Sequence, residues 1–373
     1  MLTVKVKLKK SVDDSYSIVI KSGLFEDVPG LLENYPSISG WAIISDDNVA
    51  RLYGNKLLQA VRKKVKRAEL FTFPAGERSK NRKMKAKIED EMFSAGLGRD
   101  SAVIALGGGV TGDLAGFVSA TYMRGIPYIQ VPTTLLAMVD SSIGGKTAVD
   151  VEAGKNLIGA FHQPKAVFID PCLLATLPAR QIKNGLAEMV KHAVIADDEF
   201  FSFLKKNLRD ILKLDGGMIE KALMWSCEIK ADVVEKDEKE AGLRQILNYG
   251  HTVGHALEKL SKYKLLHGEA VAVGMIVEGF ISWAMGFMKI NELERQNELI
   301  AELGFSSRAL NRFEASEIIY AMRADKKVRK GEIRMVLPKR VGEMMCSESS
   351  WSFPIKESLI KKAVKHACDR RAI

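Results

Sequence analysis

Two histidines four residues apart are the first feature of the sequence that could do chemistry, because a helix would place both on one face. They are His251 and His255, in the segment NYGHTVGHALE at 248–258. The spacing matches the H-E-x-x-H pattern of zinc peptidases, but Thr252 stands where that pattern has the glutamate that activates water. The two histidines therefore need a different role.

A helical wheel places both histidines away from the apolar side of their own helix. His251, His255 and Glu258 fall together on one side of the wheel. The apolar side consists of Val253, Ala256, Leu257 and Leu260. We therefore do not expect these histidines to face the core of their own helix.

A second helix, expected at 182–195, repeats this design. Glu188, Lys191 and His192 share its polar side. Its apolar stripe consists of Leu186, Val190, Ala193 and Val194. The sequence thus predicts two helices that each present a polar face rich in metal-ligating groups.

A third histidine, His267, precedes Gly268 and Glu269 at the start of a long apolar helix. The positive end of the helix dipole disfavours imidazolium, so we expect His267 to be neutral, as a metal ligand must be. Two or three histidines with one carboxylate suit a catalytic zinc, or a similar divalent ion, with an open coordination position. The spacing leaves open whether His255 or His192 joins that set.

A glycine-rich turn indicates a second binding site. In AVIAL followed by GGGVTGDLAGF, the glycines Gly107, Gly109 and Gly112 have the G-x-G-x-x-G spacing, between an expected strand and an expected helix. Such a turn lets the backbone approach a pyrophosphate, and the helix N-terminus favours its negative charge. The next strand, YIQVP at 128–132, is not followed by a ribose-binding acid. The turn therefore predicts a dinucleotide or phosphate site, with a tight strand–helix corner as the alternative.

The segment DSSIGGKTAVD at 140–150 resembles a phosphate-binding P-loop, but Asp140 occupies the position of the first glycine. It is therefore not a Walker motif. Lys146, which we expect in a loop between glycines, remains well placed as a cation for a phosphate or a carboxylate, with a merely solvated lysine as the alternative. Lys155, in GKN at 154–156, offers the same kind of cation again.

The element pattern divides the chain into two halves. Strands alternating with helices in the first half predict a mainly parallel α/β sheet, whereas long helical periodicity dominates after about residue 179. We expect a Rossmann-like α/β domain at 1–178 and a mainly α-helical domain at 179–373, with EIRMVLP at 332–338 as an exception. The expected strands are WAIISD (41–46), AELFTFP (68–74), AVIALGGG (102–109), YIQVP (128–132) and AVFID (166–170).

The sequence also predicts the structure of the two ends of the chain and of its most apolar segment. MLTVKVKLKK at 1–10 alternates like a strand and lacks the apolar core of a signal peptide, and KKAVKHACDRRAI at 361–373 reads as a terminal helix with His366 exposed. The segment at 270–288 is long enough to span a bilayer, but it contains Glu278 and three glycines. We expect it to be a buried helix of a protein without a membrane role.

The formal charge of +10 is compatible with nucleic-acid binding, solvated helix faces or a small anionic substrate. The basic runs RKKVKR (62–67) and RSKNRKMKAK (78–87) carry no interleaved aromatic residues, so we expect solvated faces and no nucleic-acid partner. The cysteines show no metal-binding or disulfide spacing, which favours a reducing cytoplasm. They are Cys172, Cys227, Cys346 and Cys368.

Six motifs, taken together, resemble the 3-dehydroquinate synthase family of sugar-phosphate cyclases. The motifs are GGGVTGDLAGFVSATYMRG, VPTTLLAMVDSSIGGKTAVD, GKNLIGAFHQPKAVFID, GLAEMVKHAVI, RQILNYGHTVGHALE and LHGEAVAVGM, in the family's order between about residues 40 and 340. The resemblance implies conversion of 3-deoxy-D-arabino-heptulosonate 7-phosphate to 3-dehydroquinate and phosphate, in the shikimate pathway. The alternatives are a related cyclase (of the 2-deoxy-scyllo-inosose or 2-epi-5-epi-valiolone synthase type) and a metal-dependent polyol dehydrogenase of related fold.

The resemblance also implies the cofactors and the residues that hold them. A divalent zinc or cobalt ion would bind to Glu188, His251 and His267, with His255 handling a proton near the substrate phosphate. NAD would bind to Asp46, Asn48, Glu77, Lys80, Gly108, Gly109, Val110, Asp113, Thr133 and Thr134, with Lys146 and Lys155 close by.

The substrate site implied by the resemblance is rich in cations. Its residues would be Asp140, Lys146, Lys155, Asn156, Lys191, Lys230, Arg244 and Asn248, completed by Lys326 or Lys327 and by Arg124 from the partner subunit of a homodimer. Among these, Lys146, Lys191, Arg244 and Asn248, together with His255, would be catalytic. A substrate with a phosphate and a carboxylate needs several fixed cations, and the planar fork of Arg244 suits a carboxylate.

The implied reaction begins with transient oxidation of the substrate's C5 hydroxyl by NAD. The new carbonyl acidifies the adjacent C–H bond, so phosphate leaves by β-elimination, and the hydride then returns. Ring opening and an intramolecular aldol closure give 3-dehydroquinate, so NAD is regenerated in every turnover.

Overall fold

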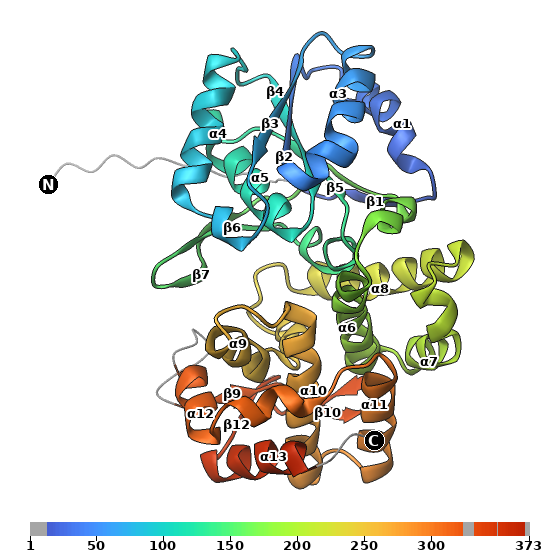
Figure 1. The fold of residues 1–373 in the computed structure, drawn as a ribbon, viewed down its shortest axis with the longest axis vertical. Coiled ribbons are helices and arrows are strands. Elements are labelled where there is room, and N and C mark those ends of the chain that lie inside the picture. The colour runs from blue at the N-terminus through green and yellow to red at the C-terminus, as the bar shows by residue number, and fades with distance from the viewer. Residues whose placement is uncertain (1–12, 324–331, 349, 370–373) are drawn as a thin grey trace, which may run out of the picture.

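The chain folds into an upper part built on a parallel sheet and a lower part built from helices (Figure 1). The computed structural model describes residues 13–323, 332–348 and 350–369. The predicted fold class, an α/β half followed by a mainly helical half, is confirmed. The strand expected at 1–10 lies outside the described residues.

The sheet contains six strands in the order β1-β8-β5-β4-β2-β3, and every neighbouring pair is parallel. The five strands predicted from apolar runs are confirmed, and β1 is an additional edge strand. Strand order reverses between β2 and β4, which makes a crevice at their carboxyl ends. The strands are β1 (Ser17–Ile20), β2 (Gly40–Asp46), β3 (Ala68–Phe73), β4 (Ser101–Gly107), β5 (Tyr128–Pro132) and β8 (Ala166–Ile169).

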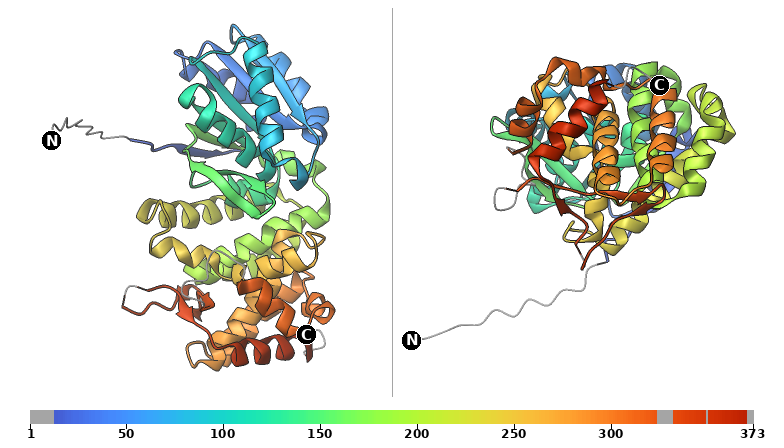
Figure 2. Two further views of the ribbon diagram at one scale, coloured as in Figure 1. Left: turned by 90° about the vertical axis from the view of Figure 1, so that its left-hand side faces the viewer. Right: turned by 90° about the horizontal axis from the view of Figure 1, so that it is seen from below.

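Helices cover both faces of this sheet (Figures 1 and 2). Alternate residues of one strand serve opposite faces, since Ile43 packs with α1 (Leu24–Leu31) and α3 (Asn55–Arg62), whereas Ile44 packs with α4 (Arg82–Ser94) and α5 (Gly109–Thr121). Both isoleucines are fully buried. A short helix, α2 (Asp47–Val49), follows β2 directly.

An antiparallel hairpin, β6 (Lys146–Val151) and β7 (Gly154–Phe161), projects from the lower edge of the sheet part. We expected a loop at this position. The hairpin is half-exposed along β7, so it lacks the continuous apolar run that marked the buried strands. It carries Lys146, Lys155 and Asn156.

The lower part consists mainly of helices, as predicted, with short strand pairs near its C-terminal end. The helices are α6 (Ala179–Ala196), α7 (Asp198–Leu212), α8 (Gly216–Lys236), α9 (His251–Leu260), α10 (His267–Ala284), α11 (Ile290–Glu302), α12 (Ala315–Arg323) and α13 (Glu357–Asp369). The strands are β9 (Arg334–Met335), β10 (Pro338–Arg340), β11 (Glu343–Met344) and β12 (Phe353–Pro354). The strand exception expected at 332–338 is thereby confirmed in part of its length.

Two expectations about this half have different outcomes. The apolar segment at 270–288 forms most of α10, which is buried at almost every position, and none of the described helices is long and apolar enough to cross a membrane. The terminal helix is confirmed as α13, but its His366 is not exposed as expected. It is half-buried because its ring stacks on Phe280 of α10, with centroids 4.2 Å apart.

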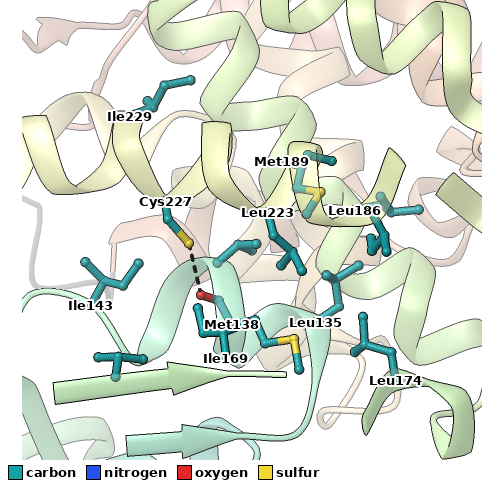
Figure 3. Packing of buried hydrophobic residues seen from close by; sticks show 14 of the residues in the cluster. Leu135, Met138, Ile143, Ile169, Leu174, Leu186, Met189, Leu223, Cys227 and Ile229 are labelled. Carbon is teal, nitrogen blue, oxygen red and sulfur yellow. Dashed lines mark hydrogen bonds between the residues drawn. The ribbon is translucent and has the colours of Figure 1, made fainter. Parts of the chain in front are cut away.

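The two parts are joined by apolar packing between α8 and the π-helical turn η5 (Ala137–Ser141) that follows β5. Figure 3 shows Cys227 of α8 facing Met138 of η5, where the thiol donates to the Met138 carbonyl oxygen at 3.5 Å. Leu223 and Leu135 extend the same contact. This packing fixes how closely α8 lies against the sheet part. It thereby fixes the position of the polar side chains that α8 carries.

Candidate active site

A glutamate and two histidines from three helices meet in the lower part. Glu188 of α6, His251 at the start of α9 and His267 at the start of α10 bring one ligand atom each within 4.8 Å of one another. Glu188 Oε1 lies 3.8 Å from His251 Nε2 and 3.4 Å from His267 Nε2. Glu188 is fully buried and this oxygen has no hydrogen-bond partner. An orphaned buried carboxylate oxygen that faces two imidazole nitrogens fits a divalent cation.

Close helix packing brings these ligands together. A Cβ atom on Gly268 would lie 2.1 Å from the carbonyl oxygen of Asn184, so only glycine lets the start of α10 approach α6 this closely. The Asn184 side chain completes the contact by accepting from the Gly268 N–H at 2.6 Å. This contact lies four residues before Glu188 and one residue after His267. Its geometry therefore sets the distance between the two ligands.

Hydrogen bonds at Nδ1 orient both histidines so that Nε2 faces Glu188. His251 Nδ1 lies 3.0 Å from the carbonyl oxygen of Tyr249, and His267 Nδ1 lies 3.3 Å from Glu258 Oε2. Partners of this kind fix the tautomer of metal-binding imidazoles. Burial lowers the pKa of His251 well below its usual value, so this ring is neutral.

His267 corrects one expectation, because it is not neutral when no cation competes. Burial alone would lower its pKa, but the carboxylates of Glu258 and Glu188 outweigh burial and raise the pKa to about 10. The sequence argument considered only the dipole of α10, which is weaker than two nearby carboxylates. A site that holds a proton this firmly is one that attracts a cation.

Metal binding should therefore depend on pH. With a folded pKa of about 10, His267 is protonated at neutral pH in the metal-free protein, and the ion must displace that proton. We expect the Kd for Co²⁺ to fall about tenfold per pH unit between about pH 6 and pH 8. Titration of metal-free protein, followed by the visible absorption of Co²⁺, measures this slope.

The Glu258→Gln variant provides the control, because it removes the carboxylate that contributes most to the raised pKa of His267. Its slope should be shallower than that of the unmodified protein. A Kd that is independent of pH in the unmodified protein would contradict the assignment of this proton.

Next to Glu188 and its two histidines, two buried lysines lie beside Asp140. Lys230 Nζ of α8 lies 2.5 Å from Asp140 Oδ1, and Lys191 Nζ of α6 lies 4.0 Å from the same oxygen and also pairs with Glu188. Burial alone would raise the pKa of Asp140, but Lys230 and Lys191 outweigh it and hold the pKa well below its usual range. Both lysines are at least nine-tenths buried. The polar face predicted for 182–195 is therefore buried as well.

Arg244 is held rigidly by backbone groups. Its Nη2 donates to the Gly144 carbonyl oxygen at 3.1 Å, its Nη1 donates to the Glu238 carbonyl oxygen, and its buried Nε has no partner. Gly144 has φ +97°, and a Cβ there would lie 2.3 Å from Arg244 Nη2. Arg244 therefore presents a pre-oriented guanidinium with an unused donor, as a carboxylate site requires.

Glu240 was not predicted from the sequence, but it holds two predicted substrate residues. It pairs with Lys146 of β6, and its Oε1 accepts from Asn248 Nδ2 at 2.5 Å. Lys146 is half-exposed, as its position at the start of the hairpin requires. Glu240 has a positive φ of 60° in the connection after α8. No local sequence signal places it opposite a lysine 94 residues earlier.

Lys155 of the hairpin reaches the lower part. Its ammonium lies 4.1 Å from the ring centroid of Tyr263 and 3.8 Å from Glu258 Oε1. Glu258 also belongs to a second group of potential ligands with His255 and His267. The His255 ring centroid lies 5.3 Å from that of His251. Neither Glu258 nor Tyr263 was predicted to belong to the site. The helical wheel had nevertheless placed Glu258 beside the histidines.

The other candidates in this region have separate positions. His192, which the spacing left open as a metal ligand, bonds through Nδ1 to Ser226 Oγ at 2.7 Å. It is not in the group of Glu188, His251 and His267, but it forms a separate group of potential ligands with Asp140 and Glu188. Asn156 has a positive φ of 55° and donates its N–H to Asp150 at 2.9 Å. Both are joined to the site through the elements that carry Lys191 and Lys155.

The predicted dinucleotide residues follow the carboxyl ends of β2, β3, β4 and β5, beside the point where strand order reverses. Helix α5 begins at Gly109 without a side-chain cap, and the buried hydroxyl of Thr133 has no hydrogen-bond partner. A Cβ on Gly108 would lie 3.1 Å from Thr134 Cγ2, so a larger residue would crowd Thr134. Glycine at this position leaves the backbone of the turn uncovered. Free helix N–H groups and an orphaned hydroxyl fit the pyrophosphate of a dinucleotide. Val110 lies in the first turn of α5.

The remaining dinucleotide candidates frame the same crevice. Lys80 is buried and lies 2.6 Å from Asp113 Oδ2 and 3.7 Å from Glu77 Oε1. Burial would lower the pKa of Lys80, but Asp113 and Glu77 outweigh burial and raise it. Asp46 caps α2 by accepting from the Asn48 N–H at 3.0 Å. The residues therefore fit the dinucleotide that the motif suggested.

One predicted substrate contact, Arg124, lies far from the glycine turn of its own chain. Arg124 is exposed at the far end of α5, which at 13 residues is about 20 Å long, so its own chain does not bring it to Gly109. Its φ of 72° is positive, which is strained for a residue other than glycine. Lys326 and Lys327 lie outside the described residues.

The fold of this chain, a parallel sheet set above helices, is similar to those of solved sugar-phosphate cyclases. A 2-epi-5-epi-valiolone synthase from Streptomyces hygroscopicus subsp. jinggangensis, with NAD⁺ and Zn²⁺ bound, is 28% identical with a TM-score of 0.87, covering 98% of this chain and 99% of that chain. A 2-deoxy-scyllo-inosose synthase complexed with carbaglucose-6-phosphate, NAD⁺ and Co²⁺ is 27% identical with a TM-score of 0.84, covering 94% and 96% respectively.

Sequence comparison narrows this class. Residues 70–184 match the family model described as 3-dehydroquinate synthase N-terminal, and residues 185–328 match the one described as 3-dehydroquinate synthase C-terminal. A 3-dehydroquinate synthase from Desulforamulus reducens is 46% identical over 331 residues, which cover 88% of this chain and 92% of that protein. The chain belongs to the 3-dehydroquinate synthase family, and the resemblance drawn from its motifs is confirmed.

Proposed function

We propose that this chain converts 3-deoxy-D-arabino-heptulosonate 7-phosphate to 3-dehydroquinate and phosphate, with NAD and a divalent zinc or cobalt ion as cofactors. The observation that carries the proposal is the placement of Lys191, Lys230 and Arg244 beside Glu188 and its two histidines. An uncharged polyol would give no reason for so many cations next to a metal site. Family membership and the NAD⁺- and metal-containing structural relatives support the same activity.

In this proposal Glu188, His251 and His267 hold the ion and keep their Nε2 and carboxylate atoms pointed at it. When bound, NAD supplies a hydride acceptor that returns the hydride within the turnover, and the ion supplies positive charge for substrate oxygens. His255, one helical turn after His251, handles a proton at a phosphate oxygen.

The anionic substrate is gripped from both parts of the molecule. Arg244 binds the carboxylate through its pre-oriented fork, while Lys146, Lys155 and Asn156 approach from the hairpin side and Asn248 from the helical side. Asp140 holds Lys191 and Lys230 in place. Because the hairpin and the helices contribute to one site, substrate binding draws them together and excludes water.

The assembly is part of the same proposal. The division into a dinucleotide-binding domain at 1–178 and a metal- and substrate-binding domain at 179–373 follows the boundary before α6. Arg124 acts on the phosphate bound to the partner subunit of a homodimer, because α5, which is about 20 Å long, separates it from Gly109 of its own chain. The described cysteines are all free, in keeping with a cytoplasmic protein.

The alternatives are separated by substrate. Related cyclases share the scaffold, and one structural relative binds carbaglucose-6-phosphate. Phosphate release should therefore be compared for 3-deoxy-D-arabino-heptulosonate 7-phosphate and for a hexose 6-phosphate, with NADH formation from glycerol measured in parallel. The proposal predicts phosphate release from the first substrate alone. Faster release from the hexose phosphate, or steady NADH formation from glycerol, would assign the chain to one of the other two activities.

Replacing Lys146 with alanine should lower kcat/KM without destabilising the fold. The side chain is 51% exposed, so its removal opens no cavity, whereas one hydrogen bond between a charged group and substrate contributes about 1.5–3 kcal/mol. We expect kcat/KM to fall about tenfold to a hundredfold, with unfolding by urea nearly unchanged. Lys165→Ala is the control, since Lys165 is exposed at the amino end of β8. Equal kinetics for the two variants would remove Lys146 from the site.

A further inference from the structure

Behind the ligand His251 lies a buried carboxylate that the proposed mechanism does not use. Glu278 is completely inaccessible in the middle of α10. Its Oε2 accepts from the Gly250 N–H at 2.7 Å, and its Oε1 accepts from the Val253 N–H at 3.2 Å. The two donors flank His251, because Gly250 is the N-cap residue of α9 and Val253 lies in its first turn, which begins at His251.

The start of α9 has no cap of its own. Its N-cap residue is Gly250, which has no side chain, and the first bond within the helix runs from the Gly254 N–H to the Gly250 carbonyl oxygen at 2.9 Å. The N–H groups before Gly254 have no partner within the helix. Glu278 therefore supplies, from a different helix, the cap that a side chain at the N-cap position usually provides.

The backbones of α9 and α10 approach each other closely beside this cap. A Cβ on Gly274 of α10 would lie 1.8 Å from the Gly250 carbonyl oxygen, and one on Gly250 would lie 2.7 Å from the Val271 carbonyl oxygen. Gly250 also needs its φ of +78°, which favours glycine. The two helices thus meet backbone to backbone at the residue that precedes His251.

The residue before Gly250 is anchored on the same surface. Tyr249 is fully buried, and its hydroxyl donates to Gln296 Oε1 of α11 at 2.7 Å. The Tyr249 carbonyl oxygen is the partner of His251 Nδ1. The orientation of the His251 ring therefore depends on the backbone that Tyr249 and Glu278 hold from either side.

From these contacts we infer that Glu278 is a positioning residue for the metal site: it caps α9 from α10 and thereby fixes the direction of His251 Nε2. Its negative charge lies at the positive end of the α9 dipole, where it is stabilising. Loss of the carboxylate leaves two buried N–H groups without an acceptor, and the first turn of α9 then relaxes around His251. The inference rests on the proposed metal site and adds the group that orients one of its ligands.

The test is Co²⁺ titration of metal-free, full-length protein carrying Glu278→Gln or Glu278→Ala. Glutamine keeps the size of the side chain but turns one of its two acceptors into a donor. We expect the Kd for Co²⁺ to rise about tenfold to a hundredfold in both variants, as it does when partners of metal-binding histidines are removed. The visible spectrum of bound Co²⁺ should change as well, because the direction of one ligand changes.

Ser282→Ala separates this role from a general loss of stability. Ser282 is also fully buried on α10, one turn after Glu278, but its hydroxyl donates to the Pro338 carbonyl oxygen and not to α9. Its removal should lower thermal stability and leave the Kd for Co²⁺ unchanged. In the His251→Ala background, Glu278→Gln should change the Kd by less than about twofold, because the ligand on which it acts is gone.

The outcomes distinguish the inference from the site on which it rests. If the unmodified protein binds no Co²⁺, the proposed metal site itself is wrong. If it binds Co²⁺ and Glu278→Gln binds with the same Kd and spectrum, the metal site stands and the positioning role of Glu278 is overturned. If Glu278→Ala does not fold, the isosteric glutamine variant and the double-variant comparison still decide the question.

Discussion

Replacing Glu188 with glutamine is expected to lower kcat/KM about a thousandfold and to weaken Co²⁺ binding more than any other single change considered. Glu188 is fully buried, and its unpartnered Oε1 faces both histidines at 3.4 and 3.8 Å. A neutral amide keeps the shape and loses the charge that holds the ion. An ion that stabilises charge by about 4 kcal/mol accounts for a loss of this size.

Two measurements on the same preparations check this expectation: steady-state phosphate release and Co²⁺ titration. Glu228→Gln removes the same charge from an exposed position on α8 and should leave both unchanged. Since Glu188 also pairs with Lys191, the variant will be less stable, so folding must be verified by circular dichroism. A folded Glu188→Gln protein with unchanged Kd for Co²⁺ would show that Glu188 is not a ligand.

Replacing Lys230 with methionine should reduce both activity and stability. Removing one partner of a fully buried ion pair costs about 3–5 kcal/mol. Here about 2 kcal/mol is expected, because the Asp140 side chain is 24% exposed and Lys191 remains 4.0 Å away. At Lys230 the effect of burial exceeds that of Asp140, so the pKa of this lysine is lowered. The intact pair therefore adds less to the stability of the fold than the loss of one partner removes. We expect kcat/KM to fall about a hundredfold.

The difference in stability between the Lys230→Met variant and the unmodified protein should depend on pH. The pKa of Asp140 is depressed in the folded protein, so its contribution is present above the usual carboxyl pKa of about 4 and is lost as the pH falls below it. Urea unfolding curves of the Lys230→Met variant and the unmodified protein should therefore differ at neutral pH and converge in acid. Asp140→Asn combined with Lys230→Met should recover stability but not activity. A constant difference at all pH values would contradict the role of this pair.

The parts of the fold that the sequence predicted are those whose signal is local. Strand β4 is a continuous apolar run bounded by a glycine turn, and α9 shows its polar and apolar sides on a helical wheel. The β6–β7 hairpin gave no such signal, because its residues are half-exposed and its lysines point to a site instead of a core. The edge strand β1 is only four residues long and was missed for the same reason.

The site was predicted to the extent that its motifs identified residue types. Glu188 and His251 were found on helical faces, but the burial of the Glu188 face against α8 depends on Lys230, which lies 42 residues later in the chain. The charge of His267 could not be inferred from its own helix, since Glu258 and Glu188 come from two others. Glu240 and Glu278 act through contacts that no spacing rule encodes.

The most direct test of the proposed activity is the number of phosphate ions released per NAD molecule. Protein loaded with Co²⁺ would be given 3-deoxy-D-arabino-heptulosonate 7-phosphate and less NAD than substrate, while phosphate and NADH absorbance are recorded together, with His251→Ala as the inactive control. The proposed activity predicts many phosphate ions per NAD, no net NADH, and neither product in the control. Phosphate release that stops at one per NAD, with NADH accumulating in equal amount, would contradict it.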